Sequence, residues 1–292
     1  MSHFALSLET WSAFPGFYIS IAVCLGLVVG SFLNVVIHRL PTMLEQALRN
    51  ECCDLLRQQK LEEEAISISL SCPPSSCPQC QQRIQPWHNI PILSYLVLRG
   101  KCHYCEQPIS ARYPIIEAVT GALTGATLWL LGLSPASVIA ILLLWTLIAL
   151  AVIDIDTYYL PDNLTLPLLW CGLIANYYEL YTSLASALWG AIMGYLSLWS
   201  IYWLFKLIAK KEGMGYGDFK LLAALGAWLG VDMLPIVILF SSFVGAVVGI
   251  GMMVILGRDK NVPIPFGPYL AIAGWITFLW GDSIVSMYLN YL

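Results

Sequence analysis

The stretch Gly213-Met214-Gly215-Tyr216-Gly217-Asp218-Phe219-Lys220 organises the chain, because it places one carboxylate among three glycines between two long apolar runs. Glycines at alternate positions favour a backbone that bends or is closely approached, rather than a regular helix. An ionisable group at membrane depth is costly, so it indicates a functional site that faces a cavity or a partner. A second acidic stretch lies upstream, Ile153-Asp154-Ile155-Asp156-Thr157-Tyr158-Tyr159-Leu160-Pro161-Asp162. The sequence therefore predicts that the fold brings acids from both stretches together at a membrane edge.

Composition defines the fold class. The chain is 59% hydrophobic and 11% charged, and its mean hydropathy is +0.74. These values exclude an ordinary soluble domain, and apolar runs recur near the length of about 20 residues that a bilayer requires. We predict an all-α polytopic membrane protein with the lipid bilayer as a partner. Nucleic acid is not an expected partner, because no segment is basic enough, and the start of the chain lacks the basic region of a cleavable signal peptide.

The apolar runs predict about eight transmembrane helices. They cover residues 17–37, 114–133, 136–153, 161–181, 184–208, 221–230, 233–256 and 268–289. The sixth run is only half a span, but if it crosses, all 14 Lys and Arg lie on one side of the membrane. Because Lys and Arg favour cytoplasmic loops, we expect both termini outside and all four acids of the two stretches at the cytoplasmic face. The short sixth run also predicts that the glycine motif dips into the membrane, as non-helical backbone can where it lines a cavity.

This pattern divides the chain into three parts. We expect a first transmembrane span over 1–38, a polar cytoplasmic segment over 39–112, and a membrane core with seven spans over 113–292. The beginning of the polar segment, from Thr42 to Glu64, mixes apolar with charged residues and predicts a solvated helix. Thr42 and Glu45 have the spacing of a capping box at its start.

Four cysteines in the polar segment have the spacing of metal ligands. Cys77-Pro-Gln-Cys80 and Cys102-His-Tyr-Cys105 are two knuckles separated by 21 residues, one more than the usual range for a paired-knuckle zinc site. Four thiolates satisfy tetrahedral zinc and leave no open position, which is typical of a structural site. Disulfides are the alternative, but a cytoplasmic segment keeps its thiols reduced. We predict a zinc site and interpret His103, inside the second knuckle, as a surface residue.

The acids are candidates for hydrolysis of a peptide bond. Two carboxylates that share a proton can activate water and polarise a carbonyl, which is the chemistry of an aspartyl protease. Asp154 ends an apolar run and Asp218 lies in a glycine bend, so ordinary structural roles explain them poorly. Asp162 lies where the first turn of a helix is expected, and an acid there complements the helix dipole. Asp156 is accounted for as a residue of a solvated loop. Two interpretations of Glu117 stay open: it is a residue of the functional site, or it is an ordinary acid in the first turn of a helix.

Taken together, these residues resemble the bacterial type IV prepilin peptidases. The resemblance rests on the two knuckles, Asn89-Ile90-Pro91 with Ser94-Tyr95, Arg99-Gly100-Lys101-Cys102, Arg112-Tyr113-Pro114 with Glu117, Asp154 with Leu160-Pro161-Asp162, and Gly215-Tyr216-Gly217-Asp218-Phe219-Lys220. The G-x-G-D form alone is shared with presenilin-like intramembrane aspartyl proteases, but the cysteine segment makes the match specific.

The resemblance implies a function and places its residues. Asp154 corresponds to the family's first catalytic aspartate, seven residues before the proline of Leu160-Pro161-Asp162, and Asp218 corresponds to the second. The family cleaves the leader of type IV prepilins and type II secretion pseudopilins at the cytoplasmic face of the bacterial inner membrane. It then N-methylates the new N-terminal residue with S-adenosylmethionine, and methylation is associated with the cysteine segment. No recognisable methyl-donor loop stands in this sequence, so these residues are not assigned.

Two other classes of function fit part of the pattern. A proton-coupled transporter also carries carboxylates within its helices, but a relay predicts acids spread through the membrane depth. A zinc module that only binds partners explains the cysteines and leaves Asp154 and Asp218 without a role. The clustering of the acids at one face favours the protease.

Overall fold

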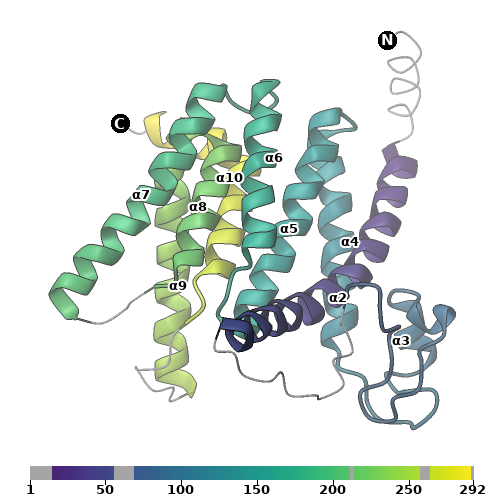
Figure 1. The fold of residues 1–292 in the computed structure, drawn as a ribbon. Coiled ribbons are helices and arrows are strands. Elements are labelled where there is room, and N and C mark those ends of the chain that lie inside the picture. Colours follow the sequence, from purple (N-terminus) through teal and green to yellow (C-terminus); the bar gives the residue numbers. More distant parts are fainter. Residues whose placement is uncertain (1–14, 56–68, 211–213, 257–263, 291–292) are drawn as a thin grey trace. The chain divides into compact units, whose positions relative to one another are not determined.

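The computed structural model describes residues 15–55, 69–210, 214–256 and 264–290, and Figure 1 shows that these residues are mainly helical, with loops around α3. The chain forms two compact units, Met1–Trp145 and Thr146–Leu292. The first contains α2 (Pro15–Leu55), η1 (Pro86–Asn89), α3 (Leu93–Val97), α4 (Arg112–Leu131) and the start of α5 (Pro135–Thr157). The second contains the end of α5, α6 (Asp162–Tyr177), α7 (Leu184–Ala209), α8 (Tyr216–Leu229), η2 (Val231–Met233), α9 (Leu234–Leu256) and α10 (Gly267–Asn290). The prediction of an all-α fold is confirmed.

The helices account for the predicted membrane spans. Each of the eight apolar runs lies largely within one helix, and six candidate spans among the described residues are long and apolar enough to cross a bilayer. The six are Pro15–Leu55, Arg112–Leu131, Pro135–Thr157, Leu184–Ala209, Val231–Ile255 and Gly267–Asn290. The chain is therefore a multi-pass membrane protein. α6 has 16 residues and α8 has 14, so their crossing stays a prediction.

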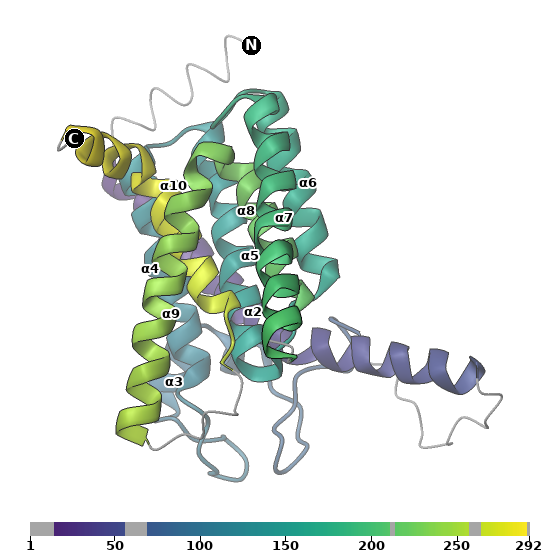
Figure 2. The same ribbon diagram turned by 90° about the vertical axis from the view of Figure 1, so that its left-hand side faces the viewer.

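The start of the polar segment differs from the prediction. α2 continues through Thr42 to Leu55 as one helix of 41 residues, with Pro41 inside it. The Thr42 hydroxyl donates to the carbonyl of His38 at 3.2 Å, one turn earlier, so Thr42 does not cap a new helix and the predicted capping box is wrong. Proline removes a single backbone donor, and here the helix continues beyond it. Figure 2 shows the last part of α2 projecting away from α4, and residues 56–64 of the predicted helix lie outside the described residues.

The glycine motif is only partly non-helical. Gly215 is extended, with φ −80° and ψ 149°, but α8 begins at the next residue and includes Gly217 and Asp218. The prediction of an irregular backbone is therefore right for Gly215 and wrong for Gly217. Gly217 has another physical role, because a Cβ there would lie 2.8 Å from Cβ of Leu160. Glycine at this position allows α8 and the loop before α6 to approach closely.

Small residues also bring α2 and α4 together in the first unit. A Cβ at Gly26 would lie 2.8 Å from Cα of Gly121, and a Cβ at Gly30 would lie 2.8 Å from Cα of Glu117. Such backbone contacts are typical of membrane helices, where packing rather than hydrophobic exclusion holds helices together. The close approach lets the Asn34 amide of α2 donate to the carbonyl of Tyr113 at the start of α4, at 3.2 Å.

α8 is the buried helix of the second unit. Its side chains from Leu221 to Leu225 are almost fully buried, as are Phe219 and Trp228, which is expected of a helix that is apolar on all sides. Its carboxyl end is fixed by Asn176, whose amide donates to the carbonyls of Ala227 and Trp228 at 2.8 and 3.1 Å. α7 packs against α8 at Gly190, where an added Cβ would collide with the carbonyl of Gly226.

We predict that Gly190→Ala lowers the thermal unfolding temperature of the detergent-solubilised protein. The added methyl group meets a backbone oxygen that cannot rotate away, and overpacking of this kind costs about 1–3 kcal/mol. Gly251→Ala on α9 is the matched control, because nothing lies within 4 Å of the Cβ position there. Equal unfolding temperatures for the two variants would contradict the close packing of α7 on α8.

Candidate functional site

The second unit brings the two predicted aspartates into one cavity. Asp154 lies in the last turn of α5 and Asp218 in the first turn of α8, with 5% and 7% of their surfaces exposed. Both line a cavity of about 170 Å³ together with Asp162 and Lys220. Asp156, predicted to lie at the same face, is exposed and is not part of this lining. The buried carboxylates of this cavity therefore come from the two acidic stretches of the sequence.

Asp154 is held in place by the beginning of α10. The backbone N–H of Gly267 donates to Oδ2 of Asp154 at 2.9 Å. A Cβ at Gly267 would lie 2.7 Å from the same oxygen, so only glycine lets the backbone approach the carboxylate. Sequence reasoning missed this residue. The signal that could have indicated it is Pro265-Phe266-Gly267-Pro268, whose glycine and prolines mark a chain break before the last apolar run.

Lys220 and Asp162 form an ion pair at the same cavity. Nζ of Lys220 lies 2.7 and 2.8 Å from the two carboxylate oxygens of Asp162. Both side chains are partly exposed, so the pair contributes at most about 1 kcal/mol to stability. The ion pair joins the start of α6 to α8. It also neutralises Asp162, whose position the sequence analysis attributed to the helix dipole. Asp154 and Asp218 are therefore the better candidates for acid and base chemistry.

The first unit brings the four predicted cysteines into one cluster. The Sγ atoms of Cys77, Cys80, Cys102 and Cys105 all lie within 4.8 Å of one another, and none forms a disulfide. Cys77 and Cys105 are 3.8 Å apart. Zinc–sulfur bonds of about 2.3 Å in a tetrahedron separate the sulfur atoms by about 3.8 Å. The donor set and its spacing thus fit a tetrahedral thiolate metal site.

The two knuckles are built in the same way. The carbonyl of Cys77 accepts from the N–H of Gln81 at 2.9 Å, and the carbonyl of Cys102 accepts from the N–H of Glu106 at 3.0 Å. Each turn is completed by a residue with positive φ, 59° at Gln81 and 56° at Glu106. The β-bridges Ser76↔Arg83 and Lys101↔Pro108 close the two loops. The sequence therefore contains a repeated turn that presents two thiols to the cluster each time.

Backbone donors stabilise a thiolate at Cys77. The N–H groups of Cys80 and Gln79 lower the pKa of the Cys77 thiol to about 6. At Cys105 the backbone N–H of Gln107 lowers the pKa, but burial and hydrogen bonds with the other three thiols raise it to about 12. Four thiols in one cluster cannot all ionise without a cation, and a metal ion bound there would supply that cation.

The remaining candidates also lie in the first unit. Glu117 is 8% exposed, and Oε2 accepts from the N–H of Ile92 at 2.8 Å. The carboxylate therefore does more than complement a helix dipole, since it fixes the loop before α3. His103 is exposed, as predicted for a surface residue, and its ring lies 4.8 Å from the ring of His88.

Known proteins match the chain over nearly its whole length. Residues 24–131 match the Bacterial Peptidase A24 N-terminal domain, and residues 141–250 match the Type IV leader peptidase family. The chain is 51% identical to the prepilin leader peptidase/N-methyltransferase of Stutzerimonas stutzeri, over 97% of this chain and 98% of the relative. Proteins of the same name from Pseudomonas aeruginosa and Aeromonas hydrophila are 50% and 52% identical, over 97% and 99% of this chain and 98% and 100% of the relatives. No solved structure matches the chain.

Fold and site define a helical, multi-pass membrane protein with a buried carboxylate pair in one unit and a four-cysteine cluster in the other. The chain belongs to the type IV leader peptidase family, and it is a bifunctional leader peptidase and N-methyltransferase. The resemblance seen in the sequence is confirmed. The family favours the enzyme over the transporter and over the passive zinc module.

We predict that the cysteine cluster binds a single tetrahedral metal ion. After zinc is exchanged for cobalt, the full-length protein should show the sulfur-to-metal charge-transfer absorption of a thiolate site, and Cys77→Ser should weaken it. Cys72→Ser is the control, because Cys72 is exposed and lies outside the cluster. Absence of zinc from freshly reduced wild-type protein would contradict the prediction.

Proposed function

We propose that this chain cleaves the leader peptide of type IV prepilins and type II secretion pseudopilins, with Asp154 and Asp218 as the catalytic residues. It then N-methylates the new N-terminal residue with S-adenosylmethionine. The observation that carries the proposal is the shared cavity of the two buried aspartates in a member of this family. The curated relatives bear the name prepilin leader peptidase/N-methyltransferase.

The carboxylate pair supplies an acid and a base. The ionised carboxylate accepts a proton from water, whose oxygen attacks the scissile carbonyl, while the protonated carboxylate donates to the carbonyl oxygen. When the tetrahedral intermediate collapses, the C–N bond breaks and a proton passes to the leaving amine. The Gly267 N–H restricts the position of Asp154. Such restriction matters because a general base must lie within hydrogen-bond reach of the water that it activates.

We assign zinc to the four cysteines in a structural role. All four positions of a tetrahedral ion are filled by Cys77, Cys80, Cys102 and Cys105, which leaves none for water or substrate. Metal binding supplies folding free energy to a small segment that has little core of its own. Zinc then stabilises the cysteine segment and takes no part in peptide cleavage.

The charge pattern supports a location for both activities. Eight of the 14 Lys and Arg lie within residues 39–112, and such a bias favours the cytoplasm. We propose the bacterial inner membrane, with the cysteine segment and the aspartates at the cytoplasmic face and both termini in the periplasm. Residues 1–38, 39–112 and 113–292 would then be the first span, the zinc segment and the peptidase core.

The first test of this proposal is the removal of each acid. Asp154→Asn and Asp218→Asn should each lower prepilin cleavage by at least about a hundredfold, because an amide cannot exchange a proton with water or the carbonyl. Asp156→Asn should keep most of the activity, since Asp156 is exposed and outside the cavity. Leader removal is followed by mass spectrometry of prepilin incubated with the solubilised enzyme. An essential Asp156 with a dispensable Asp154 would overturn the assignment.

The second test concerns the order of the two reactions. Methylation needs a free amine, which the mature residue gains only when the leader is cut. Asp218→Asn should therefore leave full-length prepilin unmethylated and still methylate pilin that has been cut beforehand. Mass spectrometry of the two substrates distinguishes the outcomes. Loss of methylation on precut pilin, with unfolding temperature and zinc content unchanged, would show that both reactions need Asp218.

A further inference from the structure

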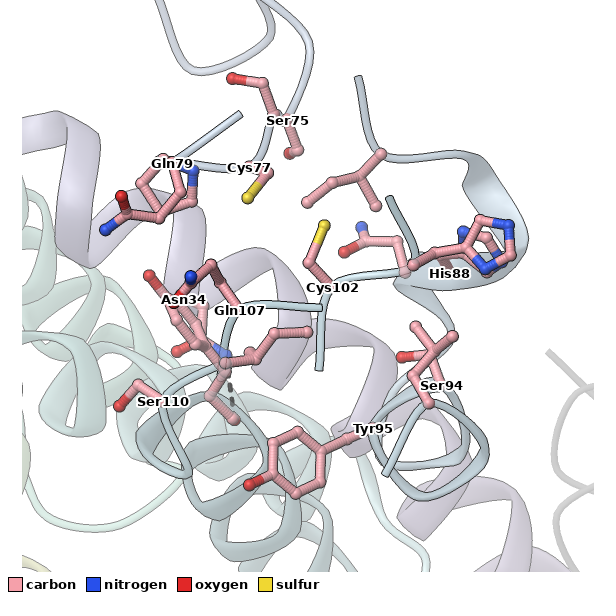
Figure 3. Close-up of a pocket in the computed structure, with 18 of the residues that line it drawn as sticks. Asn34, Ser75, Cys77, Gln79, His88, Ser94, Tyr95, Cys102, Gln107 and Ser110 are labelled. Atoms are coloured by element: carbon pink, nitrogen blue, oxygen red, sulfur yellow. Dashed lines mark hydrogen bonds between the residues drawn. The ribbon is translucent and has the colours of Figure 1, made fainter. Parts of the chain in front are cut away.

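The first unit contains a second and larger cavity, of about 580 Å³. Side chains from α2, α3, α4 and both cysteine turns line it, and Figure 3 shows Asn34, Tyr95, His88, Cys77 and Cys102 around it. The volume lies within the range of about 300–1,000 Å³ that is usual for small-molecule sites. The peptidase aspartates belong to the other unit, and none of the residues that line the proposed cleavage site lines this cavity.

A fixed carboxylate is the main feature of this cavity. Glu117 lines it and is 8% exposed. One carboxylate oxygen accepts from the N–H of Ile92 at 2.8 Å. In the part of the chain that the structure describes, no Lys, Arg or His forms an ion pair with Glu117. A buried carboxylate without a cationic partner favours a cation as ligand, because burial of a lone charge is costly.

We propose that this cavity binds S-adenosylmethionine, with Glu117 facing the sulfonium cation. This inference rests on the proposed methyltransferase function and assigns its donor site. A sulfonium is a compact positive charge that a carboxylate attracts strongly where water is partly excluded. After the methyl group is transferred, the donor becomes a neutral thioether, so the same carboxylate favours the substrate over the spent product.

Other groups of the lining suit the rest of the donor. The rings of His88 and His103 are 4.8 Å apart, and the ring of Tyr104 lies 5.2 Å from that of His103. All three residues line the cavity, and such rings offer flat apolar faces to a purine. Arg39 also lines it. One guanidinium nitrogen donates to the carbonyl of Ser69 at 3.0 Å, and the guanidinium has further donors for the carboxylate of the methionine moiety.

The cysteine cluster forms part of the same wall. Cys77 and Cys102, one from each knuckle, line the cavity beside Gln107 and Ser110. A metal ion that fixes the two turns therefore also fixes the lining contributed by residues near them. This arrangement gives a physical reason for a structural metal in a methyltransferase segment.

The charge of the proposed site is tested by Glu117→Gln, an isosteric change that removes the negative charge. Equilibrium dialysis of the zinc-loaded, full-length enzyme in detergent measures binding of S-adenosylmethionine and of S-adenosylhomocysteine. We expect Glu117→Gln to weaken S-adenosylmethionine by about tenfold or more, the effect of losing an interaction with a charged group. Binding of the neutral S-adenosylhomocysteine should change much less. Glu45→Gln is the control, because Glu45 is an exposed carboxylate on α2 outside the cavity.

The volume of the site is tested by Ser94→Trp on α3. Ser94 lines the cavity, whereas its neighbour Leu93 is 61% exposed and does not. Ser94→Trp should abolish binding of both ligands, and Leu93→Trp should leave both unchanged. Zinc content and unfolding temperature, measured on the same samples, show whether each variant is folded.

The outcomes separate this inference from the proposed function. If wild-type enzyme cleaves and methylates prepilin but folded Glu117→Gln and Ser94→Trp bind S-adenosylmethionine as wild type does, the donor lies elsewhere and only the inference fails. If Glu117→Gln weakens both ligands equally, the carboxylate does not face the sulfonium. If wild-type enzyme neither binds the donor nor methylates precut pilin, the proposed function itself fails.

Discussion

The site of the second unit depends on one constraint, that a buried carboxylate must keep a hydrogen-bond donor. The Gly267 N–H supplies this donor to Asp154. A carboxylate that leaves water loses several kcal/mol of hydration, roughly, unless protein donors replace it. Here the donor is a backbone group at the start of α10, beside a residue without a side chain. This hydrogen bond joins the end of α5 to the start of α10 at the cavity. The apolar side chains of these helices farther from the cavity then serve only to stabilise the fold.

Close backbone packing lets these helices hold such a cavity. α8 carries Asp218 at its first turn, and the rest of the helix is almost completely buried. Glycines at α7 and α8 allow the two backbones to touch, which gains dispersion energy where the hydrophobic effect between helices is weak. The position of Asp218 is consequently set by a rigid element rather than by a loop. That is the arrangement a site needs when its acid and base must meet within hydrogen-bond reach.

The sequence was sufficient to predict the features that depend on local composition or on a fixed spacing of residues. Apolar run lengths located the helices from Pro135 to Asn290, and two Cys-x-x-Cys spacings located the cluster. It failed where a contact joins distant residues. The capping box predicted from Thr42 and Glu45 failed as well, since α2 continues through both residues with Pro41 inside it. Gly267 and Lys220 contact acids 113 and 58 residues away, and no local pattern encodes such distances.

The two cavities differ in a way that the proposed chemistry explains. Hydrolysis of a peptide bond needs only water and two carboxylates, so a cavity of about 170 Å³ at the ends of helices is large enough for the reacting groups. Methyl transfer needs room for a donor molecule, and in our proposal the cavity of about 580 Å³ in the first unit supplies it. The lining of this larger cavity comes partly from the two cysteine turns, in addition to α2, α3 and α4, and turns offer the polar backbone groups that a polar ligand requires. Turns of this kind have little apolar core, so in our proposal a metal ion on the four cysteines supplies the rigidity that buried helices supply in the second unit.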